Sequence, residues 1–395
     1  GTITEAVSTQ VWSGDAVVHV SIVNWVKAKE EGKKKLYRQN GDRVDSSWEV
    51  VELDWINSSL SPKTDTSKAV AIRANQNPKR CFQGQNPVNE GFFLTPTEAR
   101  SLIEQNPNLK AIIFPYMIGR DLVEEYGPTR WIIDFGQRDL IEAMRYTEAF
   151  KRVEERVKPA VLERAEKEKA DTGKENTRWT RMASRWWKFR DYQPGTMSAI
   201  AAIPRYIACS RTTRRPIFAF VGNSVHPDTK LTIFSLSDDY SFGIIQSLIH
   251  WEWANSRGGT LKGDFSYTSE TVFDSFPWPQ SPTLTHAEKV AAAAVSLRQL
   301  RRKIMAENGW SLRDLYRTLD DAGESSFRTA HQKLDAAVRA AYGMKATDDP
   351  LAFLLALNGE LADREASMRP VVGPGLPPAV KDPAPFVTDD CISVS

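Results

Sequence analysis

Short apolar runs bounded by proline, glycine or polar turns recur through the first two thirds of the chain, and this pattern predicts β-strands. Residues 16–25 are rich in β-branched side chains and are expected to form a central strand. Further buried strands are expected at residues 111–117, 130–135, 202–210, 216–222 and 230–237.

Helical periodicity separates these runs. Thr95 can cap a helix, Pro96 suits its first turn, and Glu98 completes a capping box. Residues 140–170 have the pattern of one long helix, whose alternating charges indicate a solvated face rather than a binding patch. An amphipathic helix is expected over residues 239–254, before two consecutive glycines.

The composition changes beyond Pro282, where alanine and leucine replace most β-branched residues. Four helices are expected there, at residues 284–307, 311–320, 325–344 and 350–366. The fold class is therefore predicted to be α+β, with a mixed α/β region followed by an all-α region. The expected divisions are residues 1–60, a loop or linker at 61–90, the mixed region at 91–282, the helical region at 283–369 and an extended tail at 370–395.

Composition narrows the class of protein. The chain has 395 residues, of which 41% are hydrophobic and 26% charged, as is usual for a globular protein. No apolar run is long enough for a membrane span, which takes ~18 residues. The three cysteines lie far apart without a CxxC pair, so we expect no disulfide framework and no metal site, and a cytoplasmic location.

The charge distribution is more informative than the net charge of +2. Residues 178–215 contain nine basic residues and one acidic residue, Asp191. Arg178, Arg181, Arg185 and Lys188 have the spacing of one helical face, with tryptophans between them. This pattern predicts contact with nucleic acid. The alternative is that the tryptophans are core or interface rings and the arginines a solvated surface.

Two loops are better candidates than the helix for reading bases. They lie at residues 210–215 and 256–268 and contain glycine, serine or threonine, and such small residues let the backbone approach a groove. The predicted DNA-binding residues are Arg178, Arg181, Arg185, Lys188, Arg190, Arg211, Arg214, Arg215, Arg257, Lys262 and Tyr267.

The sequence offers no candidate catalytic or cofactor-binding residue. The stretch TVFDSFPWPQ at residues 271–280 contains prolines and aromatic rings, as does the Asn-Pro-Pro-aromatic loop that amino-methyltransferases use, but its prolines are not adjacent. We interpret it as an aromatic plug that joins the mixed region to the helical region. The five histidines are scattered, and His19, in an apolar strand, is interpreted as structural.

Several longer segments carry a resemblance to a known family. They are GRDLVEEYGPTRWIIDFG, SDDYSFGIIQSLIHWEW, TLKGDFSYTSETVFDSFPWP and LDAAVRAAYG, in that order along the chain. Together they resemble the C-terminal half of MmeI-like DNA methyltransferases, which are adenine-N6 modification enzymes often fused to a nuclease as type IIG or IIL bacterial restriction–modification proteins.

This resemblance implies roles for the divisions. Residues 1–60 would be the last strands of a methyltransferase sheet, residues 91–282 a target recognition domain, and residues 283–369 a helical C-terminal domain. It also implies that the chain is a fragment of a longer protein, in which an upstream methyltransferase domain binds S-adenosylmethionine and modifies adenine. This chain would bind double-stranded DNA and position the target, with no cofactor of its own.

Two other classes of function stay open. The modest net charge and the alanine-rich helices also suit a non-enzymatic scaffold that binds protein. A complete enzyme of another class would need a site whose residue types are absent from the patterns above.

Overall fold

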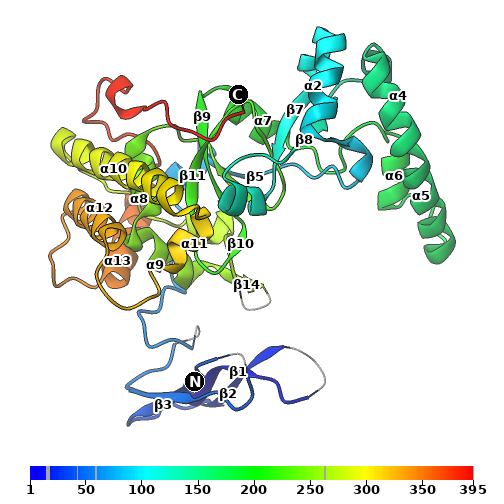
Figure 1. The fold of residues 1–395 in the computed structure, drawn as a ribbon. Coiled ribbons are helices and arrows are strands. Elements are labelled where there is room, and N and C mark those ends of the chain that lie inside the picture. The colour runs from blue at the N-terminus through cyan, green and yellow to red at the C-terminus, as the bar shows by residue number, and fades with distance from the viewer. Residues whose placement is uncertain (15–17, 42, 58–59, 262–263, 395) are drawn as a thin grey trace.

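The computed structural model describes residues 1–14, 18–41, 43–57, 60–261 and 264–394. It has three parts, which Figure 1 shows in blue, in cyan to green, and in green to red. They are an N-terminal sheet (residues 2–53), a distal lobe (residues 88–192), and a central lobe built from residues 69–85 and 193–394. Within the described residues no helix is long and apolar enough to cross a membrane.

The N-terminal sheet has the strand order β2-β1-β3-β4, with β1 and β3 parallel and the other pairs antiparallel. Its strands are β1 (Thr2–Val11), β2 (His19–Val26), β3 (Lys34–Gln39) and β4 (Trp48–Leu53). The prediction of a central strand at residues 16–25 is wrong: β2 lies at the sheet edge and its side chains are largely exposed. A β-branched run specifies a strand, but its place in a sheet depends on pairing with distant segments.

The central lobe is built on an antiparallel sheet of order β11-β9-β13-β5. Three of its strands confirm sequence predictions: β9 (Arg205–Ser210), β11 (Phe218–Gly222) and β13 (Leu231–Phe234). The fourth, β5 (Cys81–Gln83), falls in the segment expected to be a loop, together with the short helix α1 (Arg73–Gln76). Three residues are too few to show a strand period.

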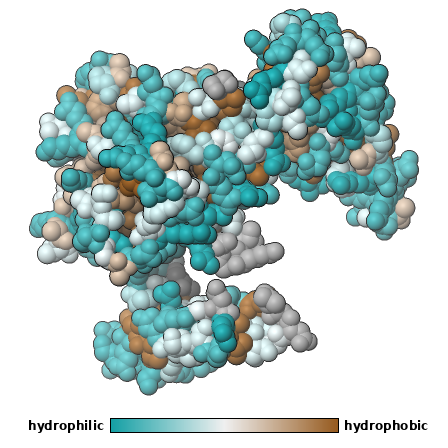
Figure 2. Space-filling view, in the orientation of Figure 1, coloured by the Kyte–Doolittle hydropathy of each residue, from teal (hydrophilic) through white to brown (hydrophobic). Residues whose placement is uncertain are grey.

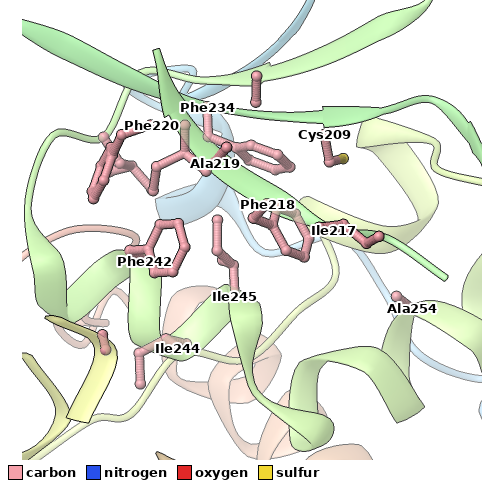
Figure 3. Close-up of a cluster of buried hydrophobic side chains, with 14 of the residues drawn as sticks. Cys209, Ile217, Phe218, Ala219, Phe220, Phe234, Phe242, Ile244, Ile245 and Ala254 are labelled. Carbon is pink, nitrogen blue, oxygen red and sulfur yellow. The ribbon is translucent and has the colours of Figure 1, made fainter. Parts of the chain in front are cut away.

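Helices cover this sheet, and the four helices predicted beyond Pro282 are confirmed. The helices of the lobe are α7 (Pro194–Ala201), α8 (Asp239–Gln246), α9 (Leu248–Arg257), α10 (Leu284–Asn308), α11 (Leu312–Arg317), α12 (Ser326–Tyr342) and α13 (Pro350–Ala366). Their buried side chains join those of the sheet in one core. Figure 3 shows Phe218 and Phe220 of β11 facing Phe242 and Ile245 of α8, and the rings of Phe220 and Phe242 lie 4.9 Å apart.

The single helix expected over residues 239–254 is in fact two. Ser247 has extended backbone angles (φ −68°, ψ 157°) and ends α8, and its hydroxyl then accepts a hydrogen bond from the His250 amide as the cap of α9. A serine can act in this way because its hydroxyl competes with the helical backbone.

The distal lobe has its own core around Phe92, Ile132, Phe150, Val153 and Trp186. Its sheet has the order β12-β7-β8-β6, and strand β12 comes from the central lobe. The strands are β6 (Phe93–Leu94), β7 (Ile113–Met117), β8 (Arg130–Ile133) and β12 (His226–Pro227); the helices are α2 (Pro96–Gln105), α3 (Leu140–Met144), α4 (Thr147–Arg156), α5 (Lys158–Thr172) and α6 (Arg178–Ala183). The capping box of Thr95 and Glu98 is present as predicted.

The long charged helix predicted at residues 140–170 is divided into α3, α4 and α5. Tyr146 leaves the helical conformation between α3 and α4. Pro159 lies in the first turn of α5, where its missing N–H does no harm but where a continuous helix would have lost a hydrogen bond.

Short helical turns and a packed C-terminal segment complete the fold. The turns are η1 (Glu90–Phe92), η2 (Pro107–Ala111), η3 (Asp121–Glu125), η4 (Ser269–Phe273) and η5 (Ala384–Phe386). The segment predicted as an extended tail is irregular, but it packs against the central lobe. Phe386 and Ile392 are buried, and Ile392 forms a β-bridge with Val221.

Candidate nucleic-acid interface

The two loops nominated as base-reading elements lie side by side. Strand β10 (Thr212–Thr213) of the first pairs antiparallel with β15 (Asp264–Ser266) of the second, and β15 pairs with β14 (Gly259–Leu261). The Tyr267 amide also donates to the carbonyl of Arg211 at 2.9 Å. Segments about fifty residues apart in sequence therefore form one small three-stranded sheet at the surface of the central lobe.

This sheet presents a group of arginines, which we call the loop arginines: Arg211, Arg214 and Arg215. Arg214 is exposed, whereas Arg215 is half-buried and pairs with Asp320 at 3.0 Å. Arg211 lines a small cleft with Thr268, Ser269 and Glu270. Because these guanidinium groups keep solvent access, they can reach a polyanion without disturbing the core.

A larger cleft of about 420 Å³, here called the basic cleft, separates β10 from α11. Its walls include Arg214 and Arg215 from the loop and Arg313 and Arg317 from α11, with Asp320 as the one carboxylate in its lining. Sequence reasoning missed the two α11 arginines. They lie about a hundred residues from the loop, in a helix whose own pattern shows nothing unusual.

Two of the predicted contact residues, Tyr267 and Arg257, make contacts within the protein. Tyr267 is 1% exposed, and its hydroxyl hydrogen-bonds to Nε2 of His250 at 3.1 Å, so its prediction as a DNA contact is wrong. Arg257 donates to the carbonyl oxygens of Thr66 at 2.7 Å and Ala69 at 3.1 Å, which fixes the segment before the central lobe. Lys262 lies outside the described residues.

The predicted helical stripe of basic residues does not form, because α6 ends at Ala183. Arg178 and Arg181 lie on α6, whereas the guanidinium of Arg185 donates to the carbonyl of Arg190 at 3.1 Å, and Lys188 Nζ donates to the carbonyl of Gln137 at 2.9 Å. Each is held by its own neighbourhood in the distal lobe, and the group is not gathered on one helical face.

Asp191 forms ion pairs with two of these basic side chains. The guanidinium of Arg190 lies 2.9 Å from its carboxylate, and that of Arg178 lies 3.7 Å away. Arg181 donates to the side chain of Asn176 at 3.2 Å. Arg178, Arg181 and Arg185 are thus exposed, and the charges of Arg178 and Arg190 are partly neutralised by Asp191.

The three interleaved tryptophans are packing residues, which is the alternative reading of the sequence. Trp186 is 7% exposed and packs against Phe150 in the distal core, with the two rings tilted by 53°. Trp187 donates from Nε1 to the carbonyl of Arg138 at 3.2 Å, and Trp179 lies under the guanidinium of Arg164 at 4.9 Å.

The stretch TVFDSFPWPQ is the structural plug that its residue pattern indicates. Phe273, Phe276 and Trp278 are buried in the central core, between β13 and helices α12 and α13. The amide of Asn75 donates to the carbonyl oxygens of Phe273, Asp274 and Phe276, and that of Asn358 donates to the carbonyl of Ser275. Buried side-chain amides from two other elements thus hold four successive carbonyl groups of the plug.

No group of three or more His, Cys, Asp or Glu side chains within the described ranges is arranged to hold a metal ion. Burial lowers the pKa of His250 to about 4, and burial together with nearby arginines lowers that of His331 to about 3.

Comparison with known proteins decides the family. The model of the MmeI target recognition domain matches residues 68–280, which is more than half of the chain. The chain belongs to this family. The match begins before the predicted boundary at residue 91, as expected if β5 belongs to the central sheet.

Two relatives show how much longer such proteins can be. DNA methyltransferase A of Bacillus subtilis is 28% identical over 181 residues, which cover 45% of this chain and 20% of that protein. The solved structure of the type IIL restriction–modification enzyme MmeI in complex with DNA matches 92% of this chain with a TM-score of 0.70 and 21% identity. This chain spans 46% of the length of that structure, and at this identity the match shows a shared fold.

Proposed function

We propose that this MmeI-type target recognition domain binds double-stranded DNA and reads its sequence with the small sheet β10-β15-β14. The observation that carries the proposal is the pairing of β10 with β15, which brings the arginine-rich loop and the glycine-rich hairpin into one exposed element. A two-stranded β-ribbon fits the major groove of B-DNA, and arginine is the commonest side chain to read guanine there.

The loop arginines differ in exposure and pairing, and we expect them to make different contacts with DNA. Arg214 is exposed and has no ion-pair partner among the described residues, so it suits a base edge or a phosphate. Arg215 is anchored by Asp320 and suits positioning contacts to the backbone. Phosphate contacts supply most of the affinity and carry the salt dependence, whereas base contacts supply discrimination of ~1–3 kcal/mol each.

The test is a charge reversal of all three loop arginines to glutamate, followed by anisotropy titration with a labelled duplex that contains the target sequence. Duplex binding should be lost at physiological salt. A milder variant with all three changed to glutamine should reduce the slope of log K against log salt by ~2–3, because each neutralised phosphate contributes ~0.9.

The matched control reverses three exposed cations elsewhere, Lys333, Arg369 and Lys381, and so changes net charge equally. It should retain binding. If both reversals weaken binding alike, net charge and not the loop explains the affinity, and the proposed surface is wrong. Circular dichroism melts of each variant establish that the fold is intact.

We further propose that the parent protein carries a methyltransferase domain that binds S-adenosylmethionine and modifies adenine at N6 in the cytoplasm. Membership in the family supports a parent protein that modifies DNA, with or without restriction. The N-terminal sheet supports a partner domain, because it leaves large apolar side chains on its surface, as Figure 2 shows. In the sheet and the segment that directly follows it, those more than 45% exposed are Trp12, Val18, Ile22, Trp25, Val44, Val50 and Trp55.

A further inference from the structure

The basic cleft adjoins a second cavity that the reading of paired DNA does not use. This cavity of about 320 Å³, here called the aromatic pocket, lies between β11, α9 and α12. Its lining includes Phe218, Leu248, Trp251, Gln332 and Asp335. Arg215 and Tyr316 line both cavities, so the basic cleft and the aromatic pocket meet at those two side chains.

The basic cleft can exchange its present ion pairs for a phosphate. Arg313 pairs with Glu124, and Arg317 pairs with Asp314 at 3.3 Å. The arginine side chains are 45% and 70% exposed, and exposed pairs of this kind contribute only ~0–1 kcal/mol. A phosphate offers three strong acceptor oxygens to such guanidinium groups.

The aromatic pocket has the chemistry of a nucleobase site. Its walls are apolar, from buried Phe218, from Leu248 and from Trp251, whose ring is held edge-on by Phe265 at 5.2 Å. Its polar groups include the exposed amide of Gln332 and the carboxylate of Asp335, and the lining also holds Gln246, Ser247, Arg328 and His331. A flat ligand with apolar faces and a hydrogen-bonding edge matches this combination.

Spare hydrogen-bonding capacity lies at the same place. Asp335 uses one oxygen to accept from the Leu248 amide at 2.7 Å, which leaves the other for a ligand. Nε2 of His331, in the pocket lining, is buried without a hydrogen-bond partner among the described residues. Unpaired polar groups of this kind are costly, and a bound ligand is one way to satisfy them.

We propose that the two cavities together bind a single nucleotide, with its phosphate in the basic cleft and its unstacked base in the aromatic pocket. The same chemistry is offered by a free nucleoside monophosphate and by one unpaired nucleotide within a bound nucleic acid. The site is separate from the base-reading role of the β10-β15-β14 sheet, apart from Arg214 and Arg215 at its border.

The first experiment is calorimetric titration of the whole chain with AMP, adenosine and inorganic phosphate. If free nucleotide is the ligand, AMP binds at least tenfold more tightly than either fragment. Arg317→Gln should then reduce the affinity for AMP to that for adenosine, and the pair Leu248→Asn and Gln332→Ala should reduce it to that for phosphate. These three positions are exposed, so the fold should tolerate the changes.

The second experiment compares a duplex that carries one bulged adenine with the same duplex fully paired. If the nucleotide comes from nucleic acid, the bulged duplex binds more tightly, and the Leu248→Asn/Gln332→Ala variant removes that preference while paired-duplex affinity is unchanged. Arg369→Gln, which lines neither cavity, is the control in both experiments.

The proposal fails if AMP and phosphate bind equally and the bulge brings no preference, or if the cavity variants leave every affinity unchanged. Loss of paired-duplex binding in the loop-arginine variants tests the proposed function separately. The two ideas can therefore fail independently.

Discussion

At the scale of single residues, buried amides and charges fix this fold more tightly than any surface ion pair. Asn75 is 1% exposed, and its amide donates to three carbonyl oxygens of the plug, at 3.1, 3.1 and 2.8 Å. No sequence pattern marks this residue, since it lies in a segment poor in periodicity, and its partners are about two hundred residues away.

Asn75→Ala should lower the free energy of unfolding by about 2–3 kcal/mol, because it removes a buried donor that three carbonyl oxygens share and leaves that of Phe276 without a donor among the described residues. Urea denaturation followed by tryptophan fluorescence measures this change. Gln76→Ala is the matched control, since Gln76 is exposed and should cost under about 0.5 kcal/mol. Equal losses in the two variants would contradict the role given to Asn75.

Buried His331 should make stability depend on pH. Its folded pKa is about 3, below its ordinary value of 6.5, so only the unfolded chain takes up a proton as the pH falls below 6.5. This histidine alone then removes up to about 1.4 kcal/mol of stability per pH unit between 6.5 and 3. Asp238 and Asp335, whose pKa values burial raises to about 6, act in the opposite direction.

The test therefore compares variants and not the wild type alone. Urea midpoints are measured at pH 7 and at pH 5 for wild type and for His331→Leu. The variant should lose less stability than wild type between pH 7 and pH 5. The exposed neighbour Gln332 provides the control, because Gln332→Leu removes no titratable group and should leave the difference between the two pH values as it is in wild type. A parallel pH dependence in wild type and His331→Leu would contradict the expected proton uptake.

At the scale of elements, helices and strands with a sequence pattern of their own could be predicted, and strands that depend on pairing with distant segments could not. The capping box before α2, the strands β7 to β9 and the helices α10 to α13 each follow from a pattern contained in the element itself. By contrast, β5, β10 and β15 have two or three residues, and pairing with distant partners makes them strands. Only the loop side of the basic cleft could be predicted, because its other wall comes from α11, which is distant in sequence.

The C-terminal segment shows how one irregular element can stabilise a lobe. Asp390 and Thr388 contact the buried guanidinium groups of Arg205 and Arg298, which also share Asp239. Burial alone would raise the pKa of Asp390, but hydrogen bonds and charge from Arg298 lower it to about 2. Its contribution to stability is therefore present above the ordinary value of about 4 and is lost as the pH falls toward 2.

Asp390→Ala should cost about 3 kcal/mol of unfolding free energy, because two buried arginines lose a counter-charge. Neighbouring Asp389 is exposed, and Asp389→Ala should cost little. Thermal melts at pH 7 measure both. An Asp390 variant as stable as the Asp389 variant would show that Asp239 alone is enough to balance the two arginines.

At the scale of the whole molecule, the three parts differ in how much core each possesses. The N-terminal sheet buries only Ala6, Leu36 and Ile56 in its own cluster, whereas the central and distal lobes have large cores. A four-stranded sheet with so little apolar burial gains little from folding alone.

Hydrogen–deuterium exchange should therefore reveal two classes of strand in this chain. Peptides from β1 to β4 should exchange at least tenfold faster than peptides from β9 and β11, because local opening follows local burial. Equal protection would mean that the sheet is stabilised by contacts beyond its own small cluster.

The origin of strand β12 has a consequence for anyone who wishes to transplant the distal lobe between relatives. His226 and Pro227 come from the central lobe, yet they extend the distal sheet beside β7, and the His226 ring stacks on Phe114 at 3.9 Å. A graft of residues 88–192 alone would leave the host's own dipeptide against a foreign strand. A working chimera must carry both discontinuous pieces.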